Sequence, residues 1–198
     1  MNSDTKVDWF VARKIQRLDT DSPWSRAMLA KLRRGIGKKA GSVPEIWEIT
    51  IGETPEAWHR HDGEPSYAEQ AAHTALTLYA AHRQGKDRSM NASGENGYSF
   101  GAAIGKLIRP DGGNEDAVKR RFDAAATAVD FIEFAHHTRG LVQLLKAEDI
   151  PFDYPKFAQD LYWYQLPGGA DGVRLRWGQD FYRARYQGNN QNQNRSQQ

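Results

Sequence analysis

The sequence contains no cysteine among its 198 residues. Disulfides, cysteine-ligated zinc, thiol catalysis and thiol redox sensing are therefore excluded. Long apolar runs are absent too, so no segment has the length needed to span a bilayer. The first residues, Met1 to Lys6, lack the apolar core of a signal peptide. We expect a cytoplasmic protein that does not associate with a membrane.

Clear strand patterns are also missing, because no stretch alternates apolar and polar residues as a half-buried strand would. Apolar residues instead recur at helical spacing through most of the chain. The hydrophobic content of 39% is that of a polar globular protein long enough to bury a core. These features predict an all-α fold of seven or eight helices.

The domain organisation is predicted to be simple. We expect one helical domain over residues 1–187, either a single unit or two packed helical halves with a boundary near the loop-like segment 85–97. The tail, 188–198, is a low-complexity run rich in Asn and Gln, and its composition predicts disorder.

Capping signals predict where the helices begin, because a Ser, Thr, Asn or Asp side chain satisfies the first free backbone N–H groups. Gly35 is expected to end the first of these helices, and Pro110 the helix after Ser99. Gly101 and Gly105 lie one turn apart, which would let another helix approach closely. Residues 114–147 can form either one continuous helix or two helices that are separated near Asp130. The predicted starts are Ser22-Pro23, Thr54-Pro55, Ser66 with Glu69, Ser99, Asn114 and Asp153 with Pro155.

Acidic residues are absent between Ser22 and Gly41, where six basic residues occur. The following stretch, from Glu45 to Glu69, carries seven acidic residues against the single base Arg60. The formal net charge of +2 conceals this segregation. A chain that sorts its charge in this way is expected to present a positive face to a polyanion.

The candidate polyanion-binding residues fall into several basic groups. At about 100° per residue, the bases of helix 23–34 lie opposite its apolar residues. Two lysines follow in a glycine-flanked loop whose backbone N–H groups are open to phosphate. The other groups lie near a helix start, where the dipole favours anions, and on the long helix that precedes residue 147. The set is Arg26, Lys31, Arg33, Arg34, Lys38, Lys39, Arg109, Lys119, Arg120, Arg121, Arg139 and Lys146; the last helix adds Arg174, Arg176, Arg183 and Arg185.

The charged residues allow two other interpretations. Any single Lys or Arg can simply keep a helix face solvated. The sequence His59-Arg60-His61-Asp62 contains the dipeptide of the helical metal-dependent HD phosphohydrolases, but Gly63 and Pro65 place it in a loop and no His precedes it. We therefore expect no metal site, no cofactor and no catalytic residues.

Ordered motifs along most of the chain resemble CasB, the helical small-subunit family of the type I-E CRISPR Cascade effector complex. No single motif is a chemical signature, but their order along the chain is specific. The matching segments are Leu32–Gly35, Thr74–Ala80, Ser99–Leu107, Lys119–Phe122, Arg139–Glu148, Ile150–Tyr154, Phe157–Leu161 and Val173–Tyr182.

The resemblance implies a non-catalytic subunit of an antiviral complex. Family members lie as a pair beside the backbone subunits that carry the guide RNA, so the expected partners are the backbone and large Cascade subunits, a second copy, guide RNA and target DNA. Their basic surface is thought to steady the guide–target duplex and the displaced strand. The positions that match here are Arg33, Arg34, Lys119, Arg120, Arg121, Arg139 and Lys146. The alternative is a protein–protein scaffold whose basic faces dock acidic partners.

Overall fold

The computed structural model describes the backbone of residues 6–94 and 97–195, and side chains as far as residue 187. Within these residues there are nine α-helices and no strand, only an isolated bridge between Asn91 and Phe152. The all-α prediction is confirmed. None of the described helices is long and apolar enough to cross a bilayer.

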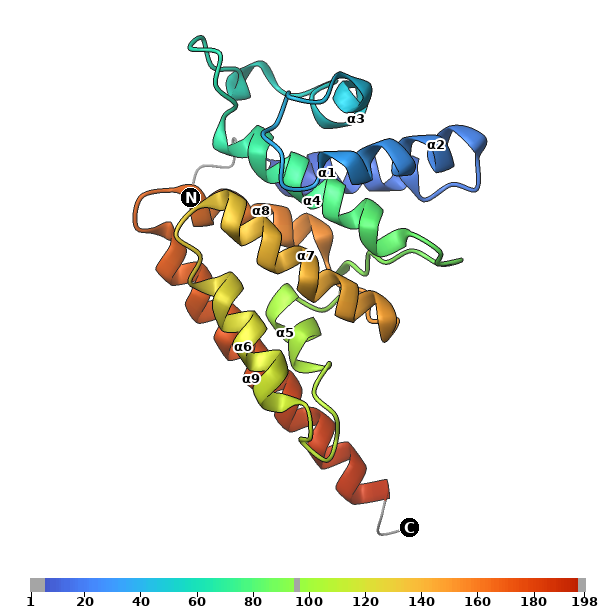
Figure 1. Cartoon of the computed structure of the whole chain (residues 1–198), viewed down its shortest axis with the longest axis vertical. Helices are drawn as coiled ribbons and strands as arrows, with labels where there is room; N and C mark the ends of the chain where they lie inside the picture. The colour runs from blue at the N-terminus through green and yellow to red at the C-terminus, as the bar shows by residue number, and fades with distance from the viewer. Residues whose placement is uncertain (1–5, 95–96, 196–198) are drawn as a thin grey trace.

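The helices are α1 (Val7–Leu18), α2 (Pro23–Leu32), α3 (Trp47–Thr50), α4 (Tyr67–Arg83), α5 (Phe100–Gly105), α6 (Glu115–Ala126), α7 (Phe131–Ala147), α8 (Tyr154–Gln165) and α9 (Gly169–Arg195). Short 3₁₀ turns occupy Arg33–Gly35, Pro44–Ile46 and Glu56–Trp58. Figure 1 shows α1 to α4 at one end of the molecule, α7 and α8 in the middle, and α6 and α9 running to the other end.

Most helices begin where the capping signals predict. Ser22 accepts a hydrogen bond from the N–H of Ser25 and opens α2. Ser66 and Glu69 form the complete capping box of α4, and Ser99 and Asp153 cap α5 and α8. Asp130 caps α7, so the segment 114–147 forms two helices rather than one.

Asn114 is the exception among the predicted caps. Its side-chain oxygen accepts from the backbone N–H of Arg109 at 2.8 Å, and its amide donates to the carbonyl of Leu107 at 2.8 Å. The side chain is therefore used by the preceding turn and does not cap α6. This turn also explains why α5 ends at Gly105, well before the predicted end at Pro110.

One further boundary differs from the prediction. The Thr54-Pro55 start opens only the 3₁₀ turn Glu56–Trp58, in which no side chain caps the N-terminus. The backbone of α9 is helical as far as Arg195, and the disorder expected for residues 188–198 stays a prediction. Residues 196–198 of the tail lie outside the described residues.

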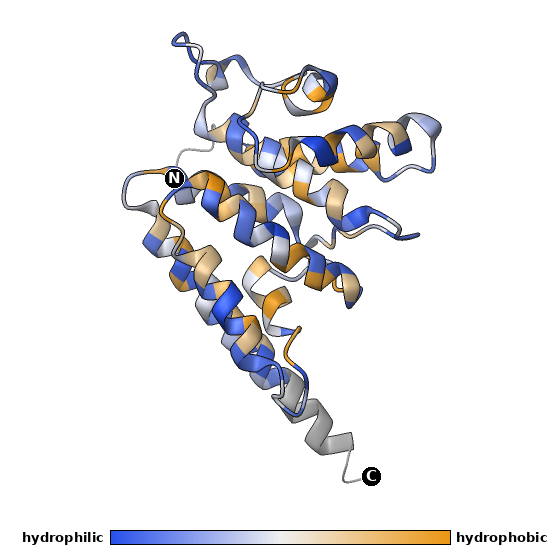
Figure 2. Ribbon diagram, viewed as in Figure 1, coloured by the Kyte–Doolittle hydropathy of each residue, from blue (hydrophilic) through white to orange (hydrophobic). Residues whose placement is uncertain are grey.

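Helix α4 forms the centre of the molecule and contacts α1, α2, α3, α7 and α8. Small side chains such as Ala71, Ala72 and Ala75 are fully buried and let the neighbouring helices approach. Most other long helices carry both hydrophilic and hydrophobic residues, as Figure 2 shows, because each buries one face. The buried residues form one continuous hydrophobic cluster from Val7 in α1 to Phe181 in α9.

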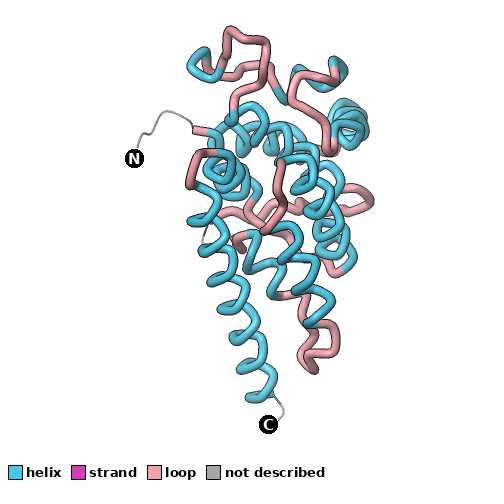
Figure 3. Tube along the Cα trace, turned by 60° about the vertical axis from the view of Figure 1, so that its left-hand side comes forward, coloured by secondary structure: helices cyan, strands magenta, loops and turns pink. Residues whose placement is uncertain are grey.

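The close contact between α5 and α9 depends on two glycines. A Cβ atom at Gly101 would overlap the carbonyl oxygen of Trp177, and one at Gly105 would overlap that of Phe181. The predicted close approach of another helix is therefore confirmed, and α9 is that helix. Figure 3 shows α9 along one edge of the molecule.

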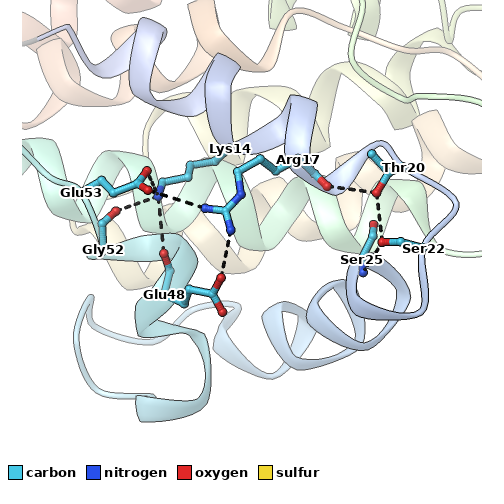
Figure 4. Close-up of polar contacts among 8 residues, drawn as sticks. All are labelled: Lys14, Arg17, Thr20, Ser22, Ser25, Glu48, Gly52 and Glu53. Atoms are coloured by element: carbon cyan, nitrogen blue, oxygen red, sulfur yellow. Dashed lines mark hydrogen bonds and ion pairs between the residues drawn. The ribbon is translucent and has the colours of Figure 1, made fainter.

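A buried lysine attaches the segment after α3 to α1 (Figure 4). The side chain of Lys14 is 2% exposed, and its Nζ donates to the carbonyl of Gly52 at 2.7 Å and to Oε2 of Glu53 at 2.9 Å. A third, longer contact reaches the carbonyl of Glu48 at 3.4 Å. One turn further along α1, Arg17 donates to the Glu48 carboxylate at 2.9 Å. These bonds compensate the cost of burying the ammonium group.

Replacing Lys14 should therefore destabilise the fold more than replacing Arg17. We expect Lys14→Met to lower the free energy of unfolding by about 1–3 kcal/mol, because backbone carbonyls lose their buried donor. Arg17→Met removes a largely exposed ion pair to the same segment and should cost less than about 1 kcal/mol. Urea unfolding of both variants measures the difference, and equal losses would contradict the proposed role of Lys14.

Candidate nucleic-acid interface

The acidic segment folds back onto the basic one. Arg34, at the end of the α2 region, pairs with Glu45 at 3.0 Å, and Lys39 pairs with Glu64. Arg26 pairs with Asp21 and Lys119 with Asp123, each at 2.5 Å. The charge segregation along the sequence is thus partly neutralised within the fold, and these four predicted cations carry a carboxylate of their own chain.

The remaining predicted cations differ in this respect. Within the described residues, none of them has a carboxylate oxygen within 4.0 Å: Lys31, Arg33, Lys38, Arg109, Arg120, Arg121, Arg139 and Lys146. A cation without an internal partner gains more from a bound phosphate, since no existing ion pair has to be broken.

A cleft of about 490 Å³ lies between the end of α2 and the end of α4. Its basic lining comes from Arg26 and Arg33 on one side and from Arg83 and Lys86 on the other. Asp19, which precedes the lining residue Thr20, receives hydrogen bonds from Tyr79 and Ser89 and lies 3.6 Å from the guanidinium of Arg83. The full lining is Thr20, Asp21, Arg26, Leu29, Arg33, Arg83, Gln84, Gly85, Lys86 and Asp87.

Lys146, in the last turn of α7, adds a third segment to this region. Its partial burial lowers the pKa of Lys146, and the positive charges of Lys86 and Arg33 lower that pKa further. Burial also lowers the pKa of the Arg33 guanidinium. Three cations that are distant in sequence therefore lie within electrostatic range of one another. We call Arg33, Lys86 and Lys146 the basic triad.

The triad contains two predicted residues and one that sequence reasoning missed. Arg33 and Lys146 belong to separate predicted groups, and the fold brings them together. Lys86 stands alone between Gly85 and Asp87 in the sequence, so no charge run marks it. Lys86 also pairs with Asp149 after α7, which fixes the ends of α4 and α7 relative to each other.

The other predicted residues are placed elsewhere. Arg139 is exposed on α7, two turns before Lys146 and on the same helix face. Arg109, Arg120 and Arg121 are exposed in and before α6 and do not line the cleft. The four predicted arginines of α9 each pair with a carboxylate of this chain: Arg174 with Asp171, Arg176 with Asp160, Arg183 with Asp180 and Arg185 with Glu115.

The histidine-rich segment lies in the loop before α4. The ring of His59 is 3.0 Å from the hydroxyl of Thr54, and Asp62 accepts hydrogen bonds from Arg60. The Arg60 hydrogen bond, helped by the N–H of Glu64, lowers the pKa of Asp62 to about 2. Across the described part of the chain, no three His, Asp or Glu side chains are grouped as metal ligands.

Comparison with known proteins places the chain in a family. A model of the family described as CRISPR-associated protein Cse2 (CRISPR_cse2) matches residues 28–182. The chain belongs to the Cse2 family. No match was found among curated protein sequences.

Solved structures agree with this assignment to Cse2. CasB from Thermobifida fusca is 32% identical, with a TM-score of 0.74, over 89% of this chain and 97% of that chain. CasB from Thermus thermophilus is 21% identical, with a TM-score of 0.64 and the same coverage of 89% and 97%. A chain of a CRISPR RNA-guided surveillance complex shares the fold at 17% identity and a TM-score of 0.69, over 93% and 98%. The sequence resemblance to CasB is confirmed.

Close to the triad, this Cse2 chain buries a histidine. His82 is fully buried in α4, where its Nδ1 is 3.1 Å from the hydroxyl of Tyr154 and its ring stacks on Phe152. Burial lowers the pKa of His82 to about 4, and the charges of Lys86 and Lys146 act in the same direction. The imidazole is therefore neutral near pH 7 and adds no charge to the basic triad.

The buried His82 predicts a specific loss of stability in acid. The pKa of the unfolded side chain is about 6.5. Between this value and the lower pKa of the folded state, the unfolded side chain is protonated whereas the folded side chain stays neutral. Folding stability that involves this group is therefore lost as the pH falls from about 6.5 to about 4, by about 3 kcal/mol in all.

Chemical unfolding over this pH range should show the loss in the native chain and not in His82→Gln. Comparing the two chains at each pH removes the contribution of the carboxylates and of His73, which both chains retain. Parallel pH profiles for the two chains would contradict the assignment to His82.

Proposed function

We propose that this chain is a non-catalytic, nucleic-acid-binding subunit of a type I-E CRISPR RNA-guided surveillance complex that acts in antiviral defence. Membership of the Cse2 family supports the assembly, because a chain of the same fold occurs in such a complex. The observation that carries nucleic-acid binding is the basic triad beside the α2–α4 cleft.

The proposed ligand of the triad is a phosphodiester backbone. Arg33 and Lys146 have no carboxylate partner within the described residues. Burial lowers the pKa of both groups, and the charges of Lys86 and Arg33 lower the pKa of Lys146 further. A phosphate group placed between them relieves this repulsion and releases the counterions that it had bound. Such contacts fix the position of a strand without reading its bases.

In the complex, these contacts are proposed to steady the guide RNA–target DNA duplex and the displaced strand. Strand exchange between a DNA duplex and an RNA–DNA duplex is nearly balanced in free energy, so a few protein–phosphate contacts are enough to tip it. Arg139 extends the row of cations along α7 from the triad, and Arg109, Arg120 and Arg121 offer a separate basic surface.

The assembly implied by this function has further parts. We infer that the chain works in the cytoplasm, contacts the backbone and large subunits, and associates with a second copy within the complex. We also infer that residues 1–187 act as one domain, because a continuous hydrophobic cluster joins α1 to α9.

The salt dependence of DNA binding tests the proposal with a matched pair of double variants. Arg33→Ala with Lys146→Ala removes two cations of the triad, whereas Arg34→Ala with Lys39→Ala removes two that are already paired with Glu45 and Glu64. We expect the first to reduce the slope of log K against log salt by about 1–2, since each lost phosphate contact removes about 0.7–0.9. The second should change the slope much less.

Fluorescence anisotropy with labelled single-stranded and double-stranded DNA measures the slope. Assembly of the complex, followed by size-exclusion chromatography, serves as the control for folding. Three results would each contradict the proposal: a DNA affinity that is independent of salt, an equal effect of the two double variants on the slope, or loss of assembly with unchanged DNA binding. The last result would favour the scaffold alternative.

A further inference from the structure

Helix α9 is apolar on two opposite faces. Its inner face buries Val173, Trp177 and Phe181 against the core. Its outer face exposes Leu175, Tyr182 and Tyr186, which are 63%, 41% and 60% accessible to solvent. A surface helix normally has one apolar face and one polar face. The second apolar face is therefore unexpected for a chain that acts alone.

The outer residues follow the spacing of a helix-packing seam. Leu175, Gln179, Tyr182 and Tyr186 are separated by four, three and four residues, so they lie on one face of α9. At 1.5 Å per residue the row is about 16 Å long, which is enough for roughly three turns of a partner helix. Gly178 lies beside the row, and a Cβ atom there would meet nothing within 4 Å. We call these four residues the α9 outer row.

The rim of the α9 outer row is basic. Arg176 and Arg183 lie on one side of it, and their side chains are 48% and 66% exposed. Their partners Asp160 and Asp180 are only 7% and 21% exposed, so the surface presents guanidinium groups and conceals the carboxylates. Next to Arg183, a pocket of about 210 Å³ adds Lys106 and Lys156.

We propose that the α9 outer row docks an amphipathic helix of another protein subunit, with acidic residues along the flank that meets Arg176 and Arg183. Exposed tyrosines and arginines around an aliphatic residue are the composition of a binding hot spot. An acidic flank complements the rim, whose carboxylates are largely concealed. Nucleic acid fits this surface less well, because the aliphatic Leu175 neither stacks on a base nor forms hydrogen bonds with one. This inference rests on the proposed function and deepens it, since it assigns one face of α9 to the contact with another subunit.

Photo-crosslinking in the assembled complex tests the docking site. Tyr182 is replaced by p-benzoylphenylalanine, and Tyr67, at the start of α4, is replaced in the same way as a control of matched exposure, 43% against 41%. We expect irradiation of the Tyr182 variant to crosslink a helical segment of another subunit that contains acidic residues. The proposal is overturned if the crosslinks form to nucleic acid, to a second copy of this chain or to residues 188–198. It is also overturned if the crosslinking yield is no higher than that of the Tyr67 control.

Charge reversal then tests the chemistry of the rim. Arg183→Glu should weaken retention of the crosslinked subunit by about tenfold, as expected for a hot-spot residue, and an acid→Lys change in the crosslinked segment should restore it. Tyr182→Ser should weaken retention similarly, while its thermal unfolding and its salt-dependent DNA binding stay unchanged. Full retention in both variants would overturn the proposal. Because DNA binding is measured separately, this outcome leaves the test of the proposed function intact.

Discussion

The buried ammonium group of Lys14 attaches part of the acidic stretch of this protein to α1. Its bonds to Gly52 and Glu53 hold the segment after α3 against α1. That segment belongs to the acidic stretch, whose neighbouring carboxylates Glu45 and Glu64 neutralise Arg34 and Lys39. Other cations, such as Arg33, are left without a carboxylate partner among the described residues. Of the basic residues that cluster in the sequence, the fold therefore leaves only some without a carboxylate partner.

Helix α4 supplies the second constraint, because it is buried along most of its length and ends at the cleft. Its last turn and the residues after it bring Arg83 and Lys86 beside Arg33 from the α2 region and Lys146 from α7. The neutral His82 lies beneath this group, so the surface charge rests on a buried layer that does not itself ionise near pH 7. The arginines Arg176 and Arg183 of α9 differ from the triad, because they pair with the buried carboxylate of Asp160 and the partly buried carboxylate of Asp180.

Local features of this structure could be predicted from the sequence, because they depend on neighbours within one turn. The capping box of Ser66 and the close approach at Gly101 are of this kind. Asn114 shows the limit, since its side chain serves a turn that the capping rule does not consider. The candidate cations could also be named, but the proximity of Arg33 and Lys146 depends on tertiary packing, and Lys86 carries no sequence signal. The ion pairs of Arg34 and Lys39 likewise become visible only in the fold.

The central claim is that the basic triad contacts the backbone of a nucleic acid. The most direct measurement is a cryo-EM structure of the assembled complex with guide RNA and target DNA bound. We expect phosphate groups within hydrogen-bonding distance of the side chains of Arg33 and Lys146, with the paired Arg34 and Lys39 farther from any phosphate. A triad that faces only protein or open solvent in the target-bound complex would contradict it.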